Sequence, residues 1–321
     1  MRLETPAHPV ELIPAAPQAL WGRLAVANFV LGGAGAGLYV LAVVFDRAVA
    51  IASWLGPALL LAGFAAVAVE AGRPLRGPRV LGRVRTSWMS RELWLGGAFA
   101  VLASSELLVR VPGQRTLAGL AALALILAQG FILRRARGVA AWDVPALPSV
   151  FLLSALLSGA GLLALVEVAT GHPPTAAFLG ALLVLLPLGG LVWLAFVTWS
   201  ADEPFAGGTR VLREGLAALT IVAAGYVLPF ALLALAVSMP ESAALTTVLA
   251  ALSMLAGQIQ AKAVLILVAG QLRPITFPHL TLQRSRTEER AQAAERSQAA
   301  SFSGHPRIDP VSRHPIQRRP S

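Results

Sequence analysis

Long apolar runs constrain this chain more than any short motif does. A bilayer core is crossed by a helix of roughly 20 apolar residues. Runs of about that length follow one another along the sequence, at 24–45, 48–69, 92–109, 116–133, 149–169, 175–199, 215–237 and 243–270. They lack the alternation of polar and apolar residues that is typical of a membrane β-barrel. The sequence therefore predicts an all-α integral membrane protein with eight transmembrane helices, arranged as two four-helix bundles.

Composition agrees with the membrane class and limits the cofactors. The chain is 56% hydrophobic and 13% charged, whereas soluble domains contain about 25% charged residues. It has no cysteine, which excludes a thiolate-bound Fe–S cluster within the chain. All five histidines lie outside the apolar runs, and a transmembrane haem b needs axial histidines within its helices. We therefore expect no haem, no Fe–S cluster and no metal site in this chain.

The two ends of the chain differ from its middle. Residues 1–23 are proline-rich and lack the basic region of a signal peptide. The membrane domain is expected over 24–270. Residues 271–321 are polar and rich in Arg, Gln, Ser and Pro, a composition typical of disorder. We interpret both ends as cytoplasmic segments that flank one membrane domain.

Basic residues are distributed unevenly between the two sides of the predicted membrane domain. Of the 26 basic residues, 22 arginines fall on the side of the N-terminus and three on the other side, with Lys262 inside the last run. By the positive-inside rule, the arginine-rich side is cytoplasmic. The net charge of +10 is thus interpreted as a topology signal and not as a nucleic-acid surface. The predicted location is a bacterial cytoplasmic (inner) membrane, with contacts to membrane lipid.

The stretch FVLGGAGAGLYV at 29–40 has two possible interpretations. A nucleotide-binding loop would need G-x-G-x-x-G between a strand and a helix, but Leu38 stands where the third glycine belongs. Gly33 and Gly37 instead form G-x-x-x-G, which lets transmembrane helices approach closely. This smooth face serves helix packing alone, or it also borders a pocket for a flat hydrophobic ligand.

Polar residues within the apolar runs are candidate site residues. One group lies near the N-terminal side of the first four runs: Asn28, Glu70, Ser87, Trp88, Ser90, Arg91, Glu92 and Gln129. A second group lies near the other side, where we expect Asp46 and Arg47 to anchor the interface and Glu106 to pair with Arg110. Lys262 lies deep in the last run, and we expect its side chain to extend toward the cytoplasmic interface.

Three stretches together resemble the NrfD/PsrC family of polysulfide-reductase-type membrane anchors, to which dimethyl-sulfoxide-reductase anchors are related. They are WGRLAVANFVLGGAGAG (21–37), EAGRPLRGPRVLGRVRTSWMSRELW (70–94) and AWDVPALPSVFLLSALLSGAGLL (141–163). The resemblance implies a haem-free, quinone-reactive subunit. Such a subunit anchors a four-cluster Fe–S electron-transfer subunit and a molybdopterin catalytic subunit, and exchanges electrons with menaquinone or ubiquinone.

The resemblance also implies where the quinone is bound. The pocket is expected in the first four helices, at about 24–133. Asn28 matches a polar position that is His in some members, and Glu70 matches a carboxylate that would transfer protons. The other expected pocket residues are Gly33, Gly37, Trp88, Arg91 and Gln129. A tyrosine that some members carry near the end of the fourth span has no match here, because Ala128 or Gln129 occupies that region.

The segment from Arg73 to Arg91 carries six arginines between the second and third runs. One interpretation is a topology signal in contact with water and anionic lipid heads. The other is a docking platform for the Fe–S subunit, because arginine forks bind carboxylates. The expected docking residues are Arg76, Arg79, Arg83 and Arg85.

A secondary transporter is the alternative function. Such a protein has broken helices and buried charges near the membrane midplane. Pro187 and Pro229 interrupt two runs, and Lys262 lies within a third. Most polar residues nevertheless gather at the two faces, which favours the quinone-reactive anchor.

Overall fold

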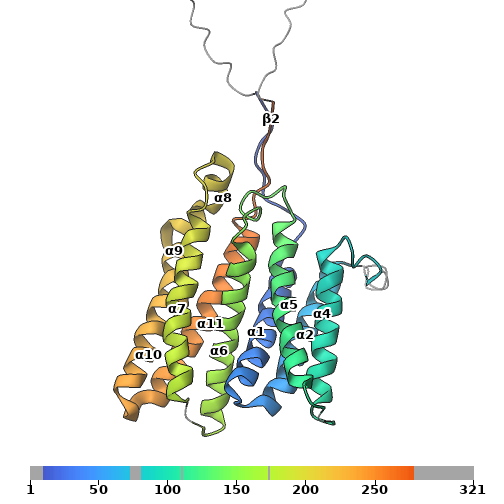
Figure 1. Ribbon diagram of the computed structural model, residues 1–321. Helices are drawn as coiled ribbons and strands as arrows, with labels where there is room; N and C mark the ends of the chain where they lie inside the picture. Colours follow the sequence, from blue (N-terminus) through green and yellow to red (C-terminus); the bar gives the residue numbers. More distant parts are fainter. Residues whose placement is uncertain (1–9, 73–80, 110, 173, 278–321) are drawn as a thin grey trace, which may run out of the picture. The chain divides into compact units, whose positions relative to one another are not determined.

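A computed structural model describes residues 10–72, 81–109, 111–172 and 174–277 (Figure 1). The chain divides into two units, one of residues 13–275 and one of the terminal segments 1–12 and 276–321. The short strands β1 (Val10–Ile13) and β2 (Ile275–Phe277) pair with each other. Most of the predicted polar tail and the first nine residues lie outside the described part of the chain.

The unit of residues 13–275 is helical. Its long helices are α1 (Arg23–Phe45), α2 (Val49–Glu70), α4 (Trp88–Ser105), α5 (Gln114–Arg134), α6 (Leu147–Ala169), α7 (Ala176–Val197) and α11 (Ala243–Leu267). Shorter pieces are α8 (Glu203–Arg213), α9 (Gly215–Val222), the π-helical turn η2 (Ala223–Val227), α10 (Leu228–Ser238) and the 3₁₀ turn η3 (Pro240–Ser242).

Seven helical segments in the described part of the chain are long and apolar enough to cross a membrane. They include the continuous segment Gly215–Ser238, formed by α9, η2 and α10. The third expected span is α4, which has 18 residues and carries Arg91 and Glu92 near its start; it falls outside this group. The chain is thus a multi-pass helical membrane protein.

The helices pack as two rings of four. In the first ring α1 contacts α2 and α5, and α4 closes the ring against α2 and α5. In the second ring α6 contacts α7 and α11, and α10 contacts the same two helices. Contacts of α1 with α6 and α11, and of α5 with α6, join the two rings, and Figure 1 shows α1, α6 and α11 in the middle of the helical unit.

The glycine stretch lies inside α1 and forms its contacts with two neighbouring helices. A Cβ atom at Gly35 would lie 2.5 Å from the carbonyl oxygen of Gly56 in α2. A Cβ atom at Gly37 would collide with the Ala155 carbonyl of α6, and Gly159 of α6 faces Gly37 in return. Only glycine permits such backbone approach, so these residues hold α1 between the two rings.

A π-helical turn interrupts the segment between α9 and α10, and Pro229 explains it. Proline has no N–H to donate to the carbonyl four residues earlier, and its ring displaces that carbonyl. The freed carbonyl belongs to Gly225, which accepts a hydrogen bond of 3.4 Å from Gln258 Nε2. Ser253 Oγ donates to the neighbouring carbonyl of Ala224 at 2.9 Å. Ser253 and Gln258 of α11 thus donate hydrogen bonds to backbone carbonyls at the break.

Candidate functional site

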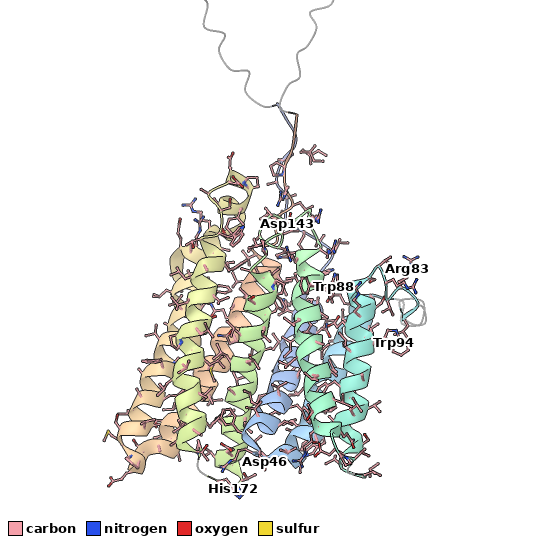
Figure 2. The ribbon with its side chains drawn as sticks, viewed as in Figure 1. Asp46, Arg83, Trp88, Trp94, Asp143 and His172 are labelled. Atoms are coloured by element: carbon pink, nitrogen blue, oxygen red, sulfur yellow. The ribbon has the colours of Figure 1, made fainter. Side chains whose placement is uncertain are left out.

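A cavity of about 290 Å³ lies at the end of the first ring where α1 begins. We call this the Trp21 end, and we call the opposite end, where α1 finishes, the Asp46 end. Figure 2 shows Trp88 and Arg83 toward the first end and Asp46 and His172 at the second. The cavity walls are mostly apolar and come from α1, α2, α4 and α5. The polar residues that line it are Asn28, Glu70 and Glu92.

Glu92 is the buried carboxylate of this cavity. Its side chain is only 5% exposed. Its Oε1 atom accepts hydrogen bonds from Asn28 Nδ2 and from Gln129 Nε2, each at 3.1 Å. No hydrogen bond from a described residue reaches its Oε2 atom, and no described Arg, Lys or His forms an ion pair with it. Two neutral amides from α1 and α5 therefore hold one oxygen, while the other is available to a ligand in the cavity.

Donating to Glu92 leaves the carbonyl oxygens of the two amides without hydrogen-bond donors. Asn28 Oδ1 and Gln129 Oε1 are buried and have no hydrogen-bond partner in the described structure. A buried acceptor without a donor costs about 1–3 kcal/mol. Such an arrangement is stable only if the carboxylate gains more from the two donors. Two N–H donors stabilise the ionised form of a carboxylate and so offset part of the cost of burying Glu92.

The start of α4 places Glu92 in the first ring. The Ser87 side chain caps this helix by accepting from the Ser90 N–H at 3.4 Å. Trp88 stacks on Phe131 of α5 with ring centroids 4.4 Å apart, which fixes the helix end against α5. Glu92 follows one turn later and faces inward.

Glu70, the expected proton-transfer residue, lines the cavity and also binds the start of α1. Its two carboxylate oxygens accept the backbone N–H groups of Gly22 and Ala25, the latter at 2.6 Å. These donors belong to the first turn of α1, whose N–H groups have no partner within the helix. Glu70 thus lines the cavity but serves as the N-terminal cap of α1.

The other expected pocket residues do not line the cavity. Gln129 reaches the cavity through Glu92. Arg91 stacks on Trp88 at 4.2 Å and donates to the carbonyls of Val84 and Arg85, each at 2.9 Å. Gly33 and Gly37 lie further along α1, beyond the cavity.

A basic hollow lies beside the cavity. Its volume is about 390 Å³, and its charged lining residues are Arg85, Arg91 and Arg135. It shares Trp21, Met89 and Ile132 with the cavity, so one wall separates the two. Of the expected docking residues, Arg83 and Arg85 are exposed. Arg76 and Arg79 lie outside the described residues.

Ion pairs occupy the Asp46 end. Glu106 pairs with Arg115, which also pairs with Asp46 at 3.3 Å. Glu167 of α6 pairs with Arg47. The expected partner of Glu106, Arg110, lies outside the described residues, so that pairing stays a prediction. Each buried carboxylate here has a guanidinium partner.

Lys262 does not extend to the interface as expected. Its side chain is 3% exposed, and its Nζ atom lies 3.6 Å from the point where a Cβ on Gly33 would be. Because Gly33 has no side chain, there is space beside α1 for the Lys262 side chain. Within the described ranges, no group of three or more His, Cys, Asp or Glu residues could hold a metal ion.

The sequence analysis places Glu92 at the depth of the site without selecting it, and it does not identify Trp21 as a site residue. The signal for Glu92 was present, because a carboxylate in the first turns of an apolar run is costly to bury. The Trp21 ring stacks on Trp142 with ring centroids 5.3 Å apart, and its centroid lies 5.5 Å from that of Phe29. Trp21 precedes α1 in the chain and lines the cavity. No protein-family model matches the chain, and no curated protein matches it significantly.

Proposed function

We propose that the chain is the haem-free membrane anchor and quinone- or quinol-reacting subunit of a molybdopterin/Fe–S oxidoreductase, with α4 as its eighth span. One observation carries the proposal: a buried carboxylate, held by two amides, faces an apolar cavity at one end of a helical ring. The resemblance to NrfD/PsrC anchors points to the same part of the chain, although it selects Glu70 for the proton-transfer role.

The cavity suits the head group of menaquinone or ubiquinone. Its volume of about 290 Å³ is near the lower end of ligand pockets, which start at about 300 Å³. Trp21, Phe29 and Phe64 give it flat apolar walls. Asn28 adds a buried amide whose Oδ1 atom has no partner among the described residues. Such a combination of apolar walls and a few polar groups is typical of sites for planar organic ligands.

The roles of the residues follow from their contacts. A bound quinone would supply a carrier of two electrons and two protons. Glu92 can hold a proton at Oε2, because its Oε1 atom is occupied by the two amides. Asn28 fixes the carboxylate orientation and presents its own amide to the cavity. Glu70 keeps the first turn of α1, and with it Asn28, in place. The aromatic walls exclude water from the carboxylate.

The basic hollow suits the Fe–S partner. It is adjacent to the cavity through Trp21, Met89 and Ile132, so a protein bound there would lie close to the bound head group. Exposed arginines attract carboxylates on a partner and steer its association. We propose that the four-cluster Fe–S subunit binds here and carries the molybdopterin subunit. The excess of arginines on this side supports a cytoplasmic location for both.

Transport is less well supported. The polar residues of the second ring gather around a cavity of about 10 Å³, lined by Ser154, Gln258 and Lys262. That volume holds about one water molecule and no organic substrate. Substrate uptake by the chain alone in liposomes would nevertheless favour transport over the proposed function.

Quinone titration of the purified protein tests the proposal. Quinones quench tryptophan fluorescence on contact, and Trp21 lines the cavity. We expect quenching in the wild type, loss of most of it in Trp21→Phe, and weaker binding in Asn28→Ala and Glu92→Gln. Glu106→Gln is the matched control, because it changes a buried carboxylate at the other end. Unchanged affinity in both Asn28→Ala and Glu92→Gln would reject this cavity as the quinone site.

A further inference from the structure

Lys262 is a buried cation without an ion-pair partner among the described residues. It lies in α11 of the second ring, and its side chain is 3% exposed. A buried charge is costly unless another charge or several hydrogen bonds compensate for it. The nearest helix of the first ring is α1, at Gly33. The question is therefore what balances Lys262.

Three buried oxygen atoms around Lys262 also have no partner in the described structure. Ser154 Oγ and Gln258 Oε1 belong to residues that line the same cavity of about 10 Å³ as Lys262. Gln129 Oε1 lies 3.5 Å from the Cβ position of Gly33, and Lys262 Nζ lies 3.6 Å from it. A lysine ammonium has three N–H donors and accepts nothing. Three acceptors near one triple donor are a matched set, with room for about one bridging water.

Gln129 joins this set to the first ring. Its Nε2 donates to Glu92 Oε1 at 3.1 Å, and its Oε1 and the Lys262 Nζ lie 3.5 and 3.6 Å from the same point, the Cβ position of Gly33. The amide dipole thus has its positive end toward a carboxylate and its negative end toward an ammonium. The opposite orientation would place an oxygen against the carboxylate. The arrangement matches a negative Glu92 and a positive Lys262.

We propose that Lys262 is the counter-charge of Glu92, coupled to it across the glycine face of α1 by the Gln129 amide. Lys262 is then a positioning residue of the second ring that acts through Gln129 on the candidate quinone site. Gly33 is required because it leaves space between the two groups. Only the role of Glu92 toward quinone rests on the proposed function; the coupling is a property of the chain itself.

Thermal unfolding of the purified protein without quinone tests the coupling. We expect Glu92→Gln and Lys262→Met each to lower Tm, and the double variant to lower it by clearly less than both losses together, because each single variant leaves one charge unbalanced. The matched control is Gln260→Met, on the same helix as Lys262, which removes a hydrogen bond to Thr220 of α9. Its effect should add fully to that of Glu92→Gln. Additive losses for Lys262→Met would overturn the proposal.

Two further measurements apply if Lys262→Met does not fold. Gly33→Ala adds a methyl group near both Gln129 Oε1 and Lys262 Nζ. We expect this substitution to lower the Tm of the wild type by more than it lowers the Tm of Glu92→Gln. Equal losses in the two backgrounds would overturn the proposal.

Infrared spectra give a second readout. The spectrum of the wild type minus that of Glu92→Gln should show a carboxylate band. The same difference in a Lys262→Arg background should keep that band, and its replacement by a protonated carboxyl band would contradict the proposal. If coupling is found but quinone binding is not, the proposed function alone fails.

Discussion

Buried carboxylates have different partners at the two ends of the helical unit. At the Asp46 end, Glu106 and Glu167 each pair with an arginine, and Tyr39 also donates to Glu106 at 3.2 Å. At the Trp21 end, Glu92 has two amide donors and no ion-pair partner among the described cations, and it faces a cavity. Both kinds of carboxylate are nearly inaccessible to solvent.

The difference separates a structural from a chemical role. An arginine beside a carboxylate holds the negative charge firmly, which ties α1, α4, α5 and α6 together but makes the group a poor proton carrier. Neutral amides stabilise the charge less and leave the group able to change its protonation state. Proton transfer in a ligand site needs that freedom. A buried glutamate therefore holds helices together at the Asp46 end and is suited to acid–base chemistry at the Trp21 end.

The largest expected effect concerns Glu92 at the Trp21 end. Glu92→Gln keeps the side-chain size but removes the proton-accepting oxygen, and general acid–base groups contribute about 10²–10⁴-fold in rate. We expect quinol- or quinone-linked turnover of the assembled complex to fall by about 10³-fold. The anchor should still insert and co-purify with its partner. Turnover within threefold of wild type would place the proton-transfer group elsewhere.

The next effect concerns the Asp46 end, where we expect a substitution to lower stability and leave quinone binding unchanged. Arg47→Met leaves Glu167, which is 2% exposed, without its ion-pair partner. Removing one member of a buried pair costs about 3–5 kcal/mol, and partial exposure of Arg47 favours the lower value. Thermal unfolding in detergent measures the loss. Quinone affinity per folded molecule should stay at the wild-type value, and a selective loss of affinity would show that the two ends are not separable.

Sequence reasoning located the helices better than their partners. Apolar length limits a span, so the expected run 116–133 is close to α5 at Gln114–Arg134. The third helix begins four residues before its expected start, because the Ser87 cap and stacking of Trp88 offset its polar first turn. The short helix α8 falls outside the predicted runs because it is amphipathic and only 11 residues long.

Partners of buried groups depend on contacts between distant helices, which one sequence does not contain. Glu106 illustrates this limit, since it pairs with Arg115 of the following helix, nine residues further along the chain. Asn28, Glu92 and Gln129 were all placed at one depth, yet their mutual hydrogen bonds appear only once α1, α4 and α5 pack together. Depth in the membrane is predictable from position along a run, whereas facing direction is not.

A third, smaller effect distinguishes the two carboxylates of the Trp21 end from each other. Glu70→Ala frees two backbone N–H groups of the first turn of α1, and loss of a helix cap costs about 0.5–2 kcal/mol. We expect a lower Tm in detergent and a smaller loss of turnover than for Glu92→Gln. Glu70→Gln, which retains one acceptor oxygen, should lose less stability than Glu70→Ala. If Glu70→Gln instead keeps its stability and abolishes turnover, then Glu70 carries the proton, as the sequence alone predicts.

The smallest effect compares the basic surfaces of the two rings. Arg83 and Arg85 are exposed, and an exposed ion pair contributes about 0.2–1 kcal/mol. Replacing both with Gln should weaken binding of the Fe–S subunit by about tenfold at low salt, and by less at high salt because salt screens exposed charges. Arg210 and Arg213 on α8 form the matched control, since α8 lies beside the second ring on the same predicted side of the membrane. Replacing that pair with Gln removes the same charge and should leave binding unchanged. If both double substitutions weaken binding of the Fe–S subunit equally, the partner responds only to the overall positive charge. The basic hollow beside the cavity would then not be the docking site.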